Sequence, residues 1–114
     1  MKARHSVPSR KRRKKVLKSA KGFWGDRSKQ YRRAKESVRR ALAYAYRDRR
    51  TKKREFRSLW ILRVNAAVKE RGLNYREFIS SLKKKNIILS RDILAQIAAE
   101  EPAVFDKIVE LAKN

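Results

Sequence analysis

Hydrophobic positions are unevenly distributed along the chain, and in its second half their spacing predicts helices. From Phe56 onward, apolar residues recur every three or four positions in four groups, and polar or helix-breaking residues separate the groups. The groups are Phe56, Trp60, Val64, Ala67 and Val68; Tyr75, Phe78, Ile79 and Leu82; Ile93, Leu94, Ile97 and Ala98; and Phe105, Ile108, Val109 and Leu111. This spacing places each group on one face of a helix. Residues 58–114 are therefore predicted to form a small helical domain, with Leu94 and Phe105 in its core.

The middle of the chain predicts one long helix. Between Asp26 and Arg71 there is neither glycine nor proline, and residues with high helix propensity dominate. The helix is expected to start near residue 26, with Asp26 as its N-cap and Gly72 just beyond its end. Its last turns are the first segment of the small domain.

Three further residues mark helix starts in the second half. Asn74, followed by Glu77 three positions on, is expected to cap one helix, and Ser90 to cap the next. Pro102 occupies a favoured first helical position before Phe105. The predicted fold class is all-α: a long, basic, helical N-terminal extension over residues 1–57 and a small helical C-terminal domain over residues 58–114.

Apolar residues are sparse in the first half, where a short helix is expected over about residues 9–21. On the long helix, one narrow stripe of mostly small residues follows helical spacing: Tyr31, Ala34, Val38, Ala41, Leu42 and Ala45. Two interpretations stay open. In the first, the stripe packs on the short helix through Val16, Leu17 and Ala20 or is simply helix-compatible filler. In the second, it allows close approach of the backbone to RNA or to a neighbouring protein.

The most informative property of this first half is its charge. Residues 1–57 hold 24 of the 34 lysines and arginines and 4 of the 11 carboxylates, so they carry +20 of the net charge of +23. Such charge opposes a compact fold in water, and a polyanion is the partner that removes the repulsion. Basic residues step all the way round the long helix, which favours contact with folded RNA over one groove of a duplex. A chromosome-compacting architectural DNA-binding protein is the alternative, although such tails are usually rich in Lys, Ala and Pro, whereas this half is Arg-rich and proline-poor.

The candidate RNA-binding residues are most of these cations and three rings among them. They are Arg4, Arg10, Lys11, Arg12, Arg13, Lys14, Lys15, Lys18, Lys21, Phe23, Trp24, Arg27, Lys29, Tyr31, Arg32, Arg33, Arg39, Arg40, Arg47, Arg49, Arg50, Lys52, Lys53, Arg54 and Arg57. Arginine suits planar, bidentate contacts with phosphate. For Phe23 and Trp24, local packing and stacking on a base are both open.

No arrangement of residues in the sequence predicts catalysis, a metal or a cofactor. Cysteine is absent, and the one histidine, His5, has no identifiable catalytic partner. Glu36 with Arg40 and Asp48 with Lys52 have the i, i+4 spacing of helix salt bridges rather than metal ligands. The sequence also lacks a phosphate-binding glycine loop and a run of 18 apolar residues, so we expect no enzyme activity and no membrane partner. The basic N-terminal run is interpreted as mature protein rather than a transit peptide.

Several segments carry a family resemblance. GFWGDR at residues 22–27, YRDRR at 46–50, REFRSLWI at 54–61, GLNY at 72–75 and the tail ILSRDILAQIAAEEPAVF at 88–105 are specific in combination. With them the chain resembles bacterial-type large-subunit ribosomal protein twenty over nearly its whole length. The resemblance implies a structural protein that binds large-subunit ribosomal RNA, joins early in assembly and contacts neighbouring large-subunit ribosomal proteins.

The resemblance also implies a location in the ribosome, cytoplasmic in a bacterium, and leaves an organellar ribosome open. In several bacteria the C-terminal domain of this family binds its own messenger RNA and represses translation. Own messenger RNA is therefore a further candidate partner here, although GLNY at residues 72–75 fixes only the family.

Overall fold

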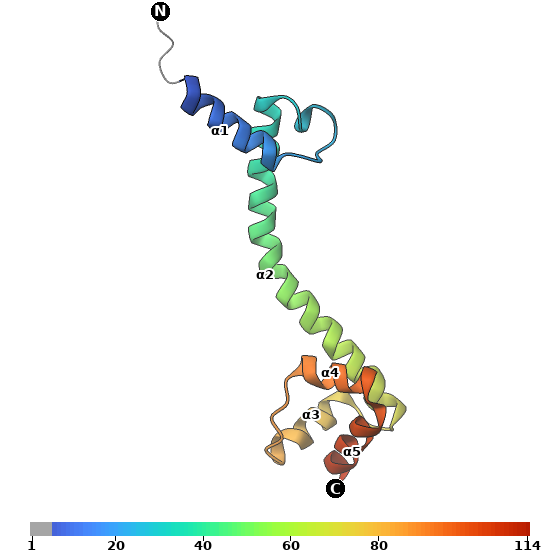
Figure 1. Ribbon diagram of the computed structural model, residues 1–114. Coiled ribbons are helices and arrows are strands. Elements are labelled where there is room, and N and C mark those ends of the chain that lie inside the picture. Colours follow the sequence, from blue (N-terminus) through green and yellow to red (C-terminus); the bar gives the residue numbers. More distant parts are fainter. Residues whose placement is uncertain (1–5) are drawn as a thin grey trace, which may run out of the picture. The chain divides into compact units, whose positions relative to one another are not determined.

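The structure, a computed structural model, describes residues 6–114 and is all-α over that range, as predicted (Figure 1). Its elements are α1 (Ser6–Ser19), a single 3₁₀ turn η1 (Gly25–Arg27), α2 (Tyr31–Glu70), α3 (Tyr75–Lys84), α4 (Arg91–Glu100) and α5 (Pro102–Lys113). The chain divides into two compact units, residues 1–50 and residues 51–114, and α2 contributes to both. We describe each unit by itself.

The first unit packs α1 and the following loop against the first turns of α2. Ala20 and Ala34 are fully buried, and the guanidinium of Arg13 on α1 lies 5.5 Å from the ring centroid of Tyr31 on α2. Small side chains at these positions allow the backbones to approach closely. The first part of the predicted stripe on α2 is therefore covered by protein.

The second part of the stripe is open. Val38 is half-buried, whereas Ala41 and Leu42 are exposed, Leu42 to 66%. Packing on the short helix thus explains only the first turns of the stripe. Beyond them, Ala41 and Leu42 face solvent and Ala45 is partly buried.

The expected start of the long helix at Asp26 is wrong. Asp26 lies in η1, where its carbonyl accepts hydrogen bonds from the backbone N–H groups of Lys29 (3.1 Å) and Gln30 (2.9 Å). These bonds close a tight turn, so α2 begins five residues later, at Tyr31. The carbonyl of Gln30 then accepts the N–H of Ala34 at 2.8 Å. Several polar residues precede α2, and local sequence does not reveal which of them turns the chain into the helix.

The first helix also differs by a few residues from the expected range of about 9–21. Because α1 covers Ser6–Ser19, Pro8 lies in its first turn rather than ahead of it. Proline is tolerated there, since the first N–H groups of a helix have no partner within it.

The end of α2 confirms the role predicted for Gly72. Gly72 adopts φ +78°, its N–H donates to the carbonyl of Lys69 (3.0 Å), and the N–H of Leu73 donates to that of Val68 (3.2 Å). This pair of bonds is the Schellman motif, and the left-handed conformation that it requires suits glycine.

The end of α3 repeats this motif with a residue that the sequence did not single out. Asn86 adopts φ +56°, its N–H donates to the carbonyl of Lys83 (3.1 Å), and the N–H of Ile87 donates to that of Leu82 (2.9 Å). Asparagine is the residue that most often replaces glycine at this position. The start residues are as predicted: Asn74 and Ser90 occupy N-cap positions and Pro102 begins α5, although neither Asn74 nor Ser90 caps the backbone through its side chain.

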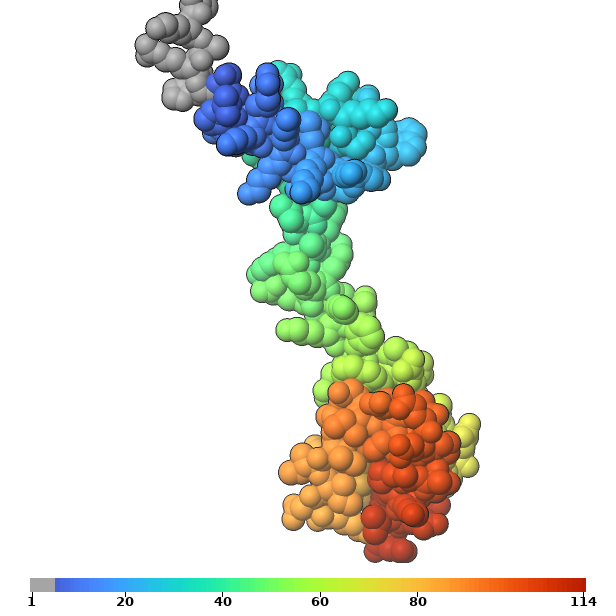
Figure 2. Space-filling model, viewed as in Figure 1, coloured from blue at the N-terminus to red at the C-terminus, as the bar shows by residue number. Residues whose placement is uncertain are grey.

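The second unit is built around one apolar core to which all four of its helices contribute. The buried members are Val64, Val68, Phe78, Leu82, Leu94, Ala95, Phe105, Val109 and Ala112. Leu94 and Phe105 are both fully buried, which confirms the prediction. Figure 2 shows the side chains of α3, α4 and α5, coloured orange to red, in close contact.

Three residues predicted for these faces are exposed. Phe56 is 43% exposed, Ile93 44% and Leu111 55%, whereas Ala95 and Ala112 are buried. Spacing identifies a helix face but does not resolve its edges, where neighbouring positions differ by 100° of rotation. Packing of α5 on α3 and α4 selects the alanines because they fit where the helices approach closely.

An arginine at the end of α2 fastens α5 to this core. Arg71 donates through Nε to Asp106 Oδ1 and through Nη1 to the carbonyl of Ala67 (2.8 Å). Its guanidinium lies 5.0 Å from the ring centroid of Phe105, and its own carbonyl accepts a bond from Lys113 Nζ (2.9 Å). Arg71 therefore joins the end of α2 to both ends of α5.

Candidate nucleic-acid interface

The basic side chains of residues 10–57 remain on the surface. Every lysine and arginine from Arg10 to Arg57 is exposed. On α2 these residues point in all directions, because successive helical positions differ by 100°. The candidate Arg4 and the lone His5 lie outside the residues that the structure describes.

Carboxylates neutralise little of this charge. Within residues 6–57, the ion pairs are Glu36 with Arg40 (2.8 Å) and Asp48 with Arg47 (3.0 Å), both on the surface. The first was expected. The second differs from the expected pair, which was Asp48 with Lys52. Asp48 instead accepts a hydrogen bond from its neighbour Arg47, and Nζ of Lys52 lies 5.7 Å from the ring centroid of Phe56. Exposed pairs of this kind contribute only about 0–1 kcal/mol to stability. Since residues 1–57 hold 24 basic and 4 acidic residues, the surface stays strongly positive.

Aromatic rings stand beside several of the cations. The ring of Tyr44 has the Arg47 guanidinium 4.6 Å from its centroid, and Tyr46 has Arg50 at 3.7 Å. Such pairs combine a flat stacking surface with a positive charge. The candidate set omitted Tyr44 and Tyr46, although their spacing of three or four residues from an arginine would have identified them.

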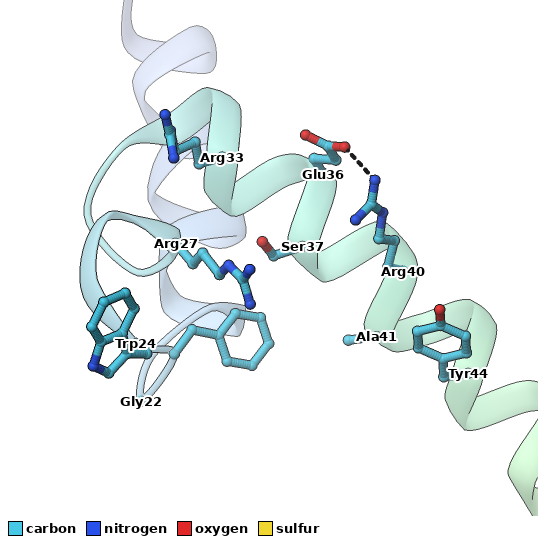
Figure 3. Close-up of a pocket in the computed structure, with 10 residues that line it drawn as sticks. Gly22, Trp24, Arg27, Arg33, Glu36, Ser37, Arg40, Ala41 and Tyr44 are labelled. Atoms are coloured by element: carbon cyan, nitrogen blue, oxygen red, sulfur yellow. Dashed lines mark hydrogen bonds and ion pairs between the residues drawn. The ribbon is translucent and has the colours of Figure 1, made fainter.

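A groove of about 820 Å³ lies between the loop after α1 and one face of α2 (Figure 3). Residues 22–27 form one side, and α2 contributes Arg33, Ser37, Ala41 and Tyr44 to the other. Ser37, Ala41 and Tyr44 follow one another at helical spacing, so they share one face of the helix. Figure 3 shows the Arg27 side chain extending from the loop toward this face.

Backbone geometry fixes the loop that forms this groove. Gly22 (φ +94°) and Gly25 (φ +60°) adopt conformations that other residues rarely adopt. The N–H of Phe23 donates to the carbonyl of Ala20 (3.1 Å), and the Ser28 hydroxyl donates to the carbonyl of Gly25 (2.9 Å). Between the two glycines, Phe23 turns partly inward, whereas Trp24 is 88% exposed.

The second unit offers a smaller basic feature. A shallow hollow on α3 is lined by Arg76 and Lys83 together with Tyr75, Ile79 and Ser80. Arg76 and Lys83 are the two cations of this hollow. The rest of residues 58–114 is nearly balanced in charge, with eight basic and seven acidic residues.

Other kinds of site are missing from the part of the chain that the structure describes. Over residues 6–114, no three His, Asp or Glu side chains gather as metal ligands would. Within the same range, no helix combines the length and the apolar character that crossing a membrane requires.

An exposed, cation-rich helical unit together with a small helical core in the same chain defines a class of protein: a basic all-α protein whose surface suits a polyanion. The model of the family described as ribosomal protein L20 matches residues 2–108. Large ribosomal subunit protein bL20 of Acidiphilium cryptum is 56% identical over 110 residues, which is 96% of this chain and 93% of that protein. Its counterpart in Desulfatibacillum aliphaticivorans is 53% identical over 112 residues, 98% and 97% of the two chains.

The chain therefore belongs to the ribosomal protein L20 family. Membership makes it a structural, non-enzymatic protein of the large subunit of bacterial-type ribosomes, in the cytoplasm. The resemblance drawn from GFWGDR, YRDRR, REFRSLWI and GLNY is confirmed.

Proposed function

We propose that this chain binds large-subunit ribosomal RNA directly, through the cations of residues 1–57, and that this binding promotes an early step of subunit assembly. One observation carries the proposal: in a segment with a net charge of +20, every described lysine and arginine from Arg10 onward is exposed. Phosphates are the partner that neutralises such a surface, and the release of their counterions drives association.

The arrangement of the cations favours folded RNA. A helix lying in one groove of a duplex needs one basic face, but on the part of α2 up to Arg57 basic residues point in nearly every direction. Phosphates from several RNA segments can surround such a helix. The cations of such a helix neutralise these phosphates and so lower the repulsion between the RNA segments, which is the physical basis for a role early in assembly.

Residues 58–114, which make up most of the second unit, have a different part in the proposal. Residues 58–114 carry ten basic and seven acidic residues, too little net charge for indiscriminate binding. Cations such as those of the α3 hollow orient a surface that recognises RNA shape. Neighbouring proteins of the large subunit are partners in the same proposal. The messenger RNA that encodes this chain is a further partner if it folds to a shape similar to that of the ribosomal RNA which this surface recognises.

Titration of the full-length chain with large-subunit ribosomal RNA, at several salt concentrations and with excess duplex DNA as competitor, tests direct binding. We expect retention on the RNA and a linear fall of log K with log salt. If duplex DNA displaced the chain from the ribosomal RNA as efficiently as added ribosomal RNA does, this result would support the chromosome-compacting alternative instead.

Reconstitution of large subunits with this chain omitted tests the role in assembly. We expect the particles to stall at an early, less compact stage, which sedimentation detects. If adding the chain last completes the particles as fast as adding it first, its role in assembly is not early.

A further inference from the structure

Trp24 lines the groove between residues 22–27 and α2, and its ring is unusually exposed. An indole that is 88% exposed leaves a large apolar surface in water. The loop does not need this ring for its fold, because the two glycines and the hydrogen bonds of Phe23 and Ser28 already hold it. The loop thus fixes the backbone of Trp24, and the exposed indole adds little to the packing of the loop.

The opposite side of the groove also carries a ring. Tyr44 is half exposed and has the Arg47 guanidinium 4.6 Å from its ring centroid. Among the residues that α2 contributes to the groove, Ser37 and Ala41 are small and leave room for a ligand. A groove that only bound phosphates would not need rings on either side.

Charge at the groove fits a nucleic acid strand. Arg27, Arg33 and Arg40 line it, and the one lining carboxylate, Glu36, is already paired with Arg40 at 2.8 Å. Cations that follow a backbone, together with rings that stack on bases, are what proteins use to hold single-stranded nucleic acid. A base inside a duplex is stacked on its neighbours and offers no face to a protein ring, whereas an unpaired base does.

We propose that this groove binds unpaired nucleotides of RNA, with a base stacked on Trp24 and the adjoining phosphates held by Arg27 and Arg33. The inference rests on the proposed function, since it specifies which part of the RNA the first unit takes. It gives the basic segment a preference for bulges and loops in addition to its general attraction to phosphate. Stacking is tolerant of base identity, so the preference is for an unpaired base rather than for a sequence.

Binding to two synthetic RNA hairpins of equal charge tests the inference: one fully paired, and one in which unpaired purines replace an equal number of paired nucleotides. We expect the full-length chain to prefer the bulged hairpin. Trp24→Ala should weaken binding to the bulged hairpin by about five- to 150-fold, the value of one stacked base, and leave binding to the paired hairpin unchanged. Trp24→Phe should restore part of the loss.

Tyr46→Ala is the matched control. Tyr46 is an exposed ring on the same unit that does not line the groove, and neither substitution changes the charge. We expect Tyr46→Ala to affect both hairpins equally. Trp60→Phe supplies a second measurement, because it leaves Trp24 as the only tryptophan: the bulged hairpin should quench the fluorescence and the paired one should not.

The outcomes separate the two proposals. If the wild-type chain binds both hairpins equally and Trp24→Ala changes neither, the groove does not take unpaired nucleotides, while the proposed binding of RNA stands. If Tyr46→Ala weakened binding to the bulged hairpin as much as Trp24→Ala does, and left binding to the paired hairpin unchanged, the inference would also be overturned. If the wild-type chain binds neither hairpin nor ribosomal RNA in dilute salt, direct RNA binding itself is wrong.

Discussion

The rings of Phe78 on α3 and Phe105 on α5 lie with their centroids 5.8 Å apart and their planes inclined by 49°, and both side chains are fully buried. Such a tilted pair brings the edge of one ring toward the face of the other, which adds about 0.5–1.5 kcal/mol to the effect of burial. Phe105→Ala should lower the free energy of unfolding of the second unit by about 3–5 kcal/mol. Urea denaturation of the full chain, followed through the partly buried Trp60, measures the loss.

Leu94 provides an independent test of the same core. It is fully buried on α4, and Leu94→Ala should cost about 2–5 kcal/mol. The control is Ile88→Ala, because Ile88 is 93% exposed and its truncation should stay within about 0.5 kcal/mol. Equal effects of the two substitutions would contradict the assignment of the α4 face.

Arg71 should matter more than its carboxylate partner. Asp106 is half exposed, so Asp106→Asn removes an ion pair worth about 0.2–1 kcal/mol. Arg71→Ala also removes the bond to the Ala67 carbonyl and the contact with the ring of Phe105, and should cost more. The same denaturation experiment compares the two variants. If Asp106→Asn lowered the free energy of unfolding more than Arg71→Ala did, the ion pair, rather than the bond to the Ala67 carbonyl and the contact with the Phe105 ring, would be what holds α5.

Phosphate contacts on α2 should be additive in the salt dependence of RNA binding. If Arg49 contacts a phosphate, Arg49→Gln lowers the slope of log K against log salt by roughly 0.7–0.9, and Arg49→Lys keeps it. Glu55→Gln is the control, because it removes a charge of the opposite sign from the same helix and should not reduce the slope. If no substitution that neutralises a cation of α2 changes the slope of log K against log salt, phosphate contacts distributed along this helix are excluded.

The segment 1–57 should be largely disordered when it is produced alone. Its described part buries little apolar surface, and this cannot offset about 1–2 kcal/mol of backbone entropy per residue together with the repulsion of its charges. Added ribosomal RNA should restore its helicity, which circular dichroism detects. A cooperative thermal transition of the fragment in dilute buffer without RNA would show that it folds by itself.

Ser90 should affect the titration of Asp92 at the start of α4. A hydrogen bond from Ser90 to the Asp92 carboxylate, with a smaller contribution from the backbone at Ile93, lowers the pKa of Asp92 below its ordinary value. Because this pKa is lower in the folded chain than in the unfolded chain, the stabilisation is present at neutral pH. It is lost as the pH falls through the lowered value. Ser90→Ala should raise the pKa of Asp92, which NMR titration measures, whereas Ser81→Ala should not change it.

Sequence allowed the helices of the second half to be predicted well because each has a local start or stop signal. Gly72, Asn74 and Pro102 act through backbone conformations that their own chemistry favours, so their positions followed from the residues alone. Asn86 ends α3 by the same left-handed geometry, but asparagine is common enough elsewhere that it gives no clear signal by itself.

The start of α2 and the groove could not be predicted in this way. The turn at Asp26 depends on which of several polar residues closes the backbone hydrogen bonds, and more than one choice is compatible with the local sequence. Trp24 and Tyr44 are twenty positions apart, and their common groove depends on how the loop folds back on α2. The basic surface, by contrast, followed from composition, because a segment so rich in charge has no interior in which to place it.

The scarcity of buried side chains in the first unit also bears on the lifetime of the protein in the cell. Among its described residues only Ala20 and Ala34 are fully buried, and lysines and arginines occur every few positions along an accessible backbone. A copy without RNA would thus present many cleavage sites to proteases, whereas a copy enclosed by RNA would shield them. Degradation would remove the surplus copies and keep the amount of this protein matched to the supply of ribosomal RNA.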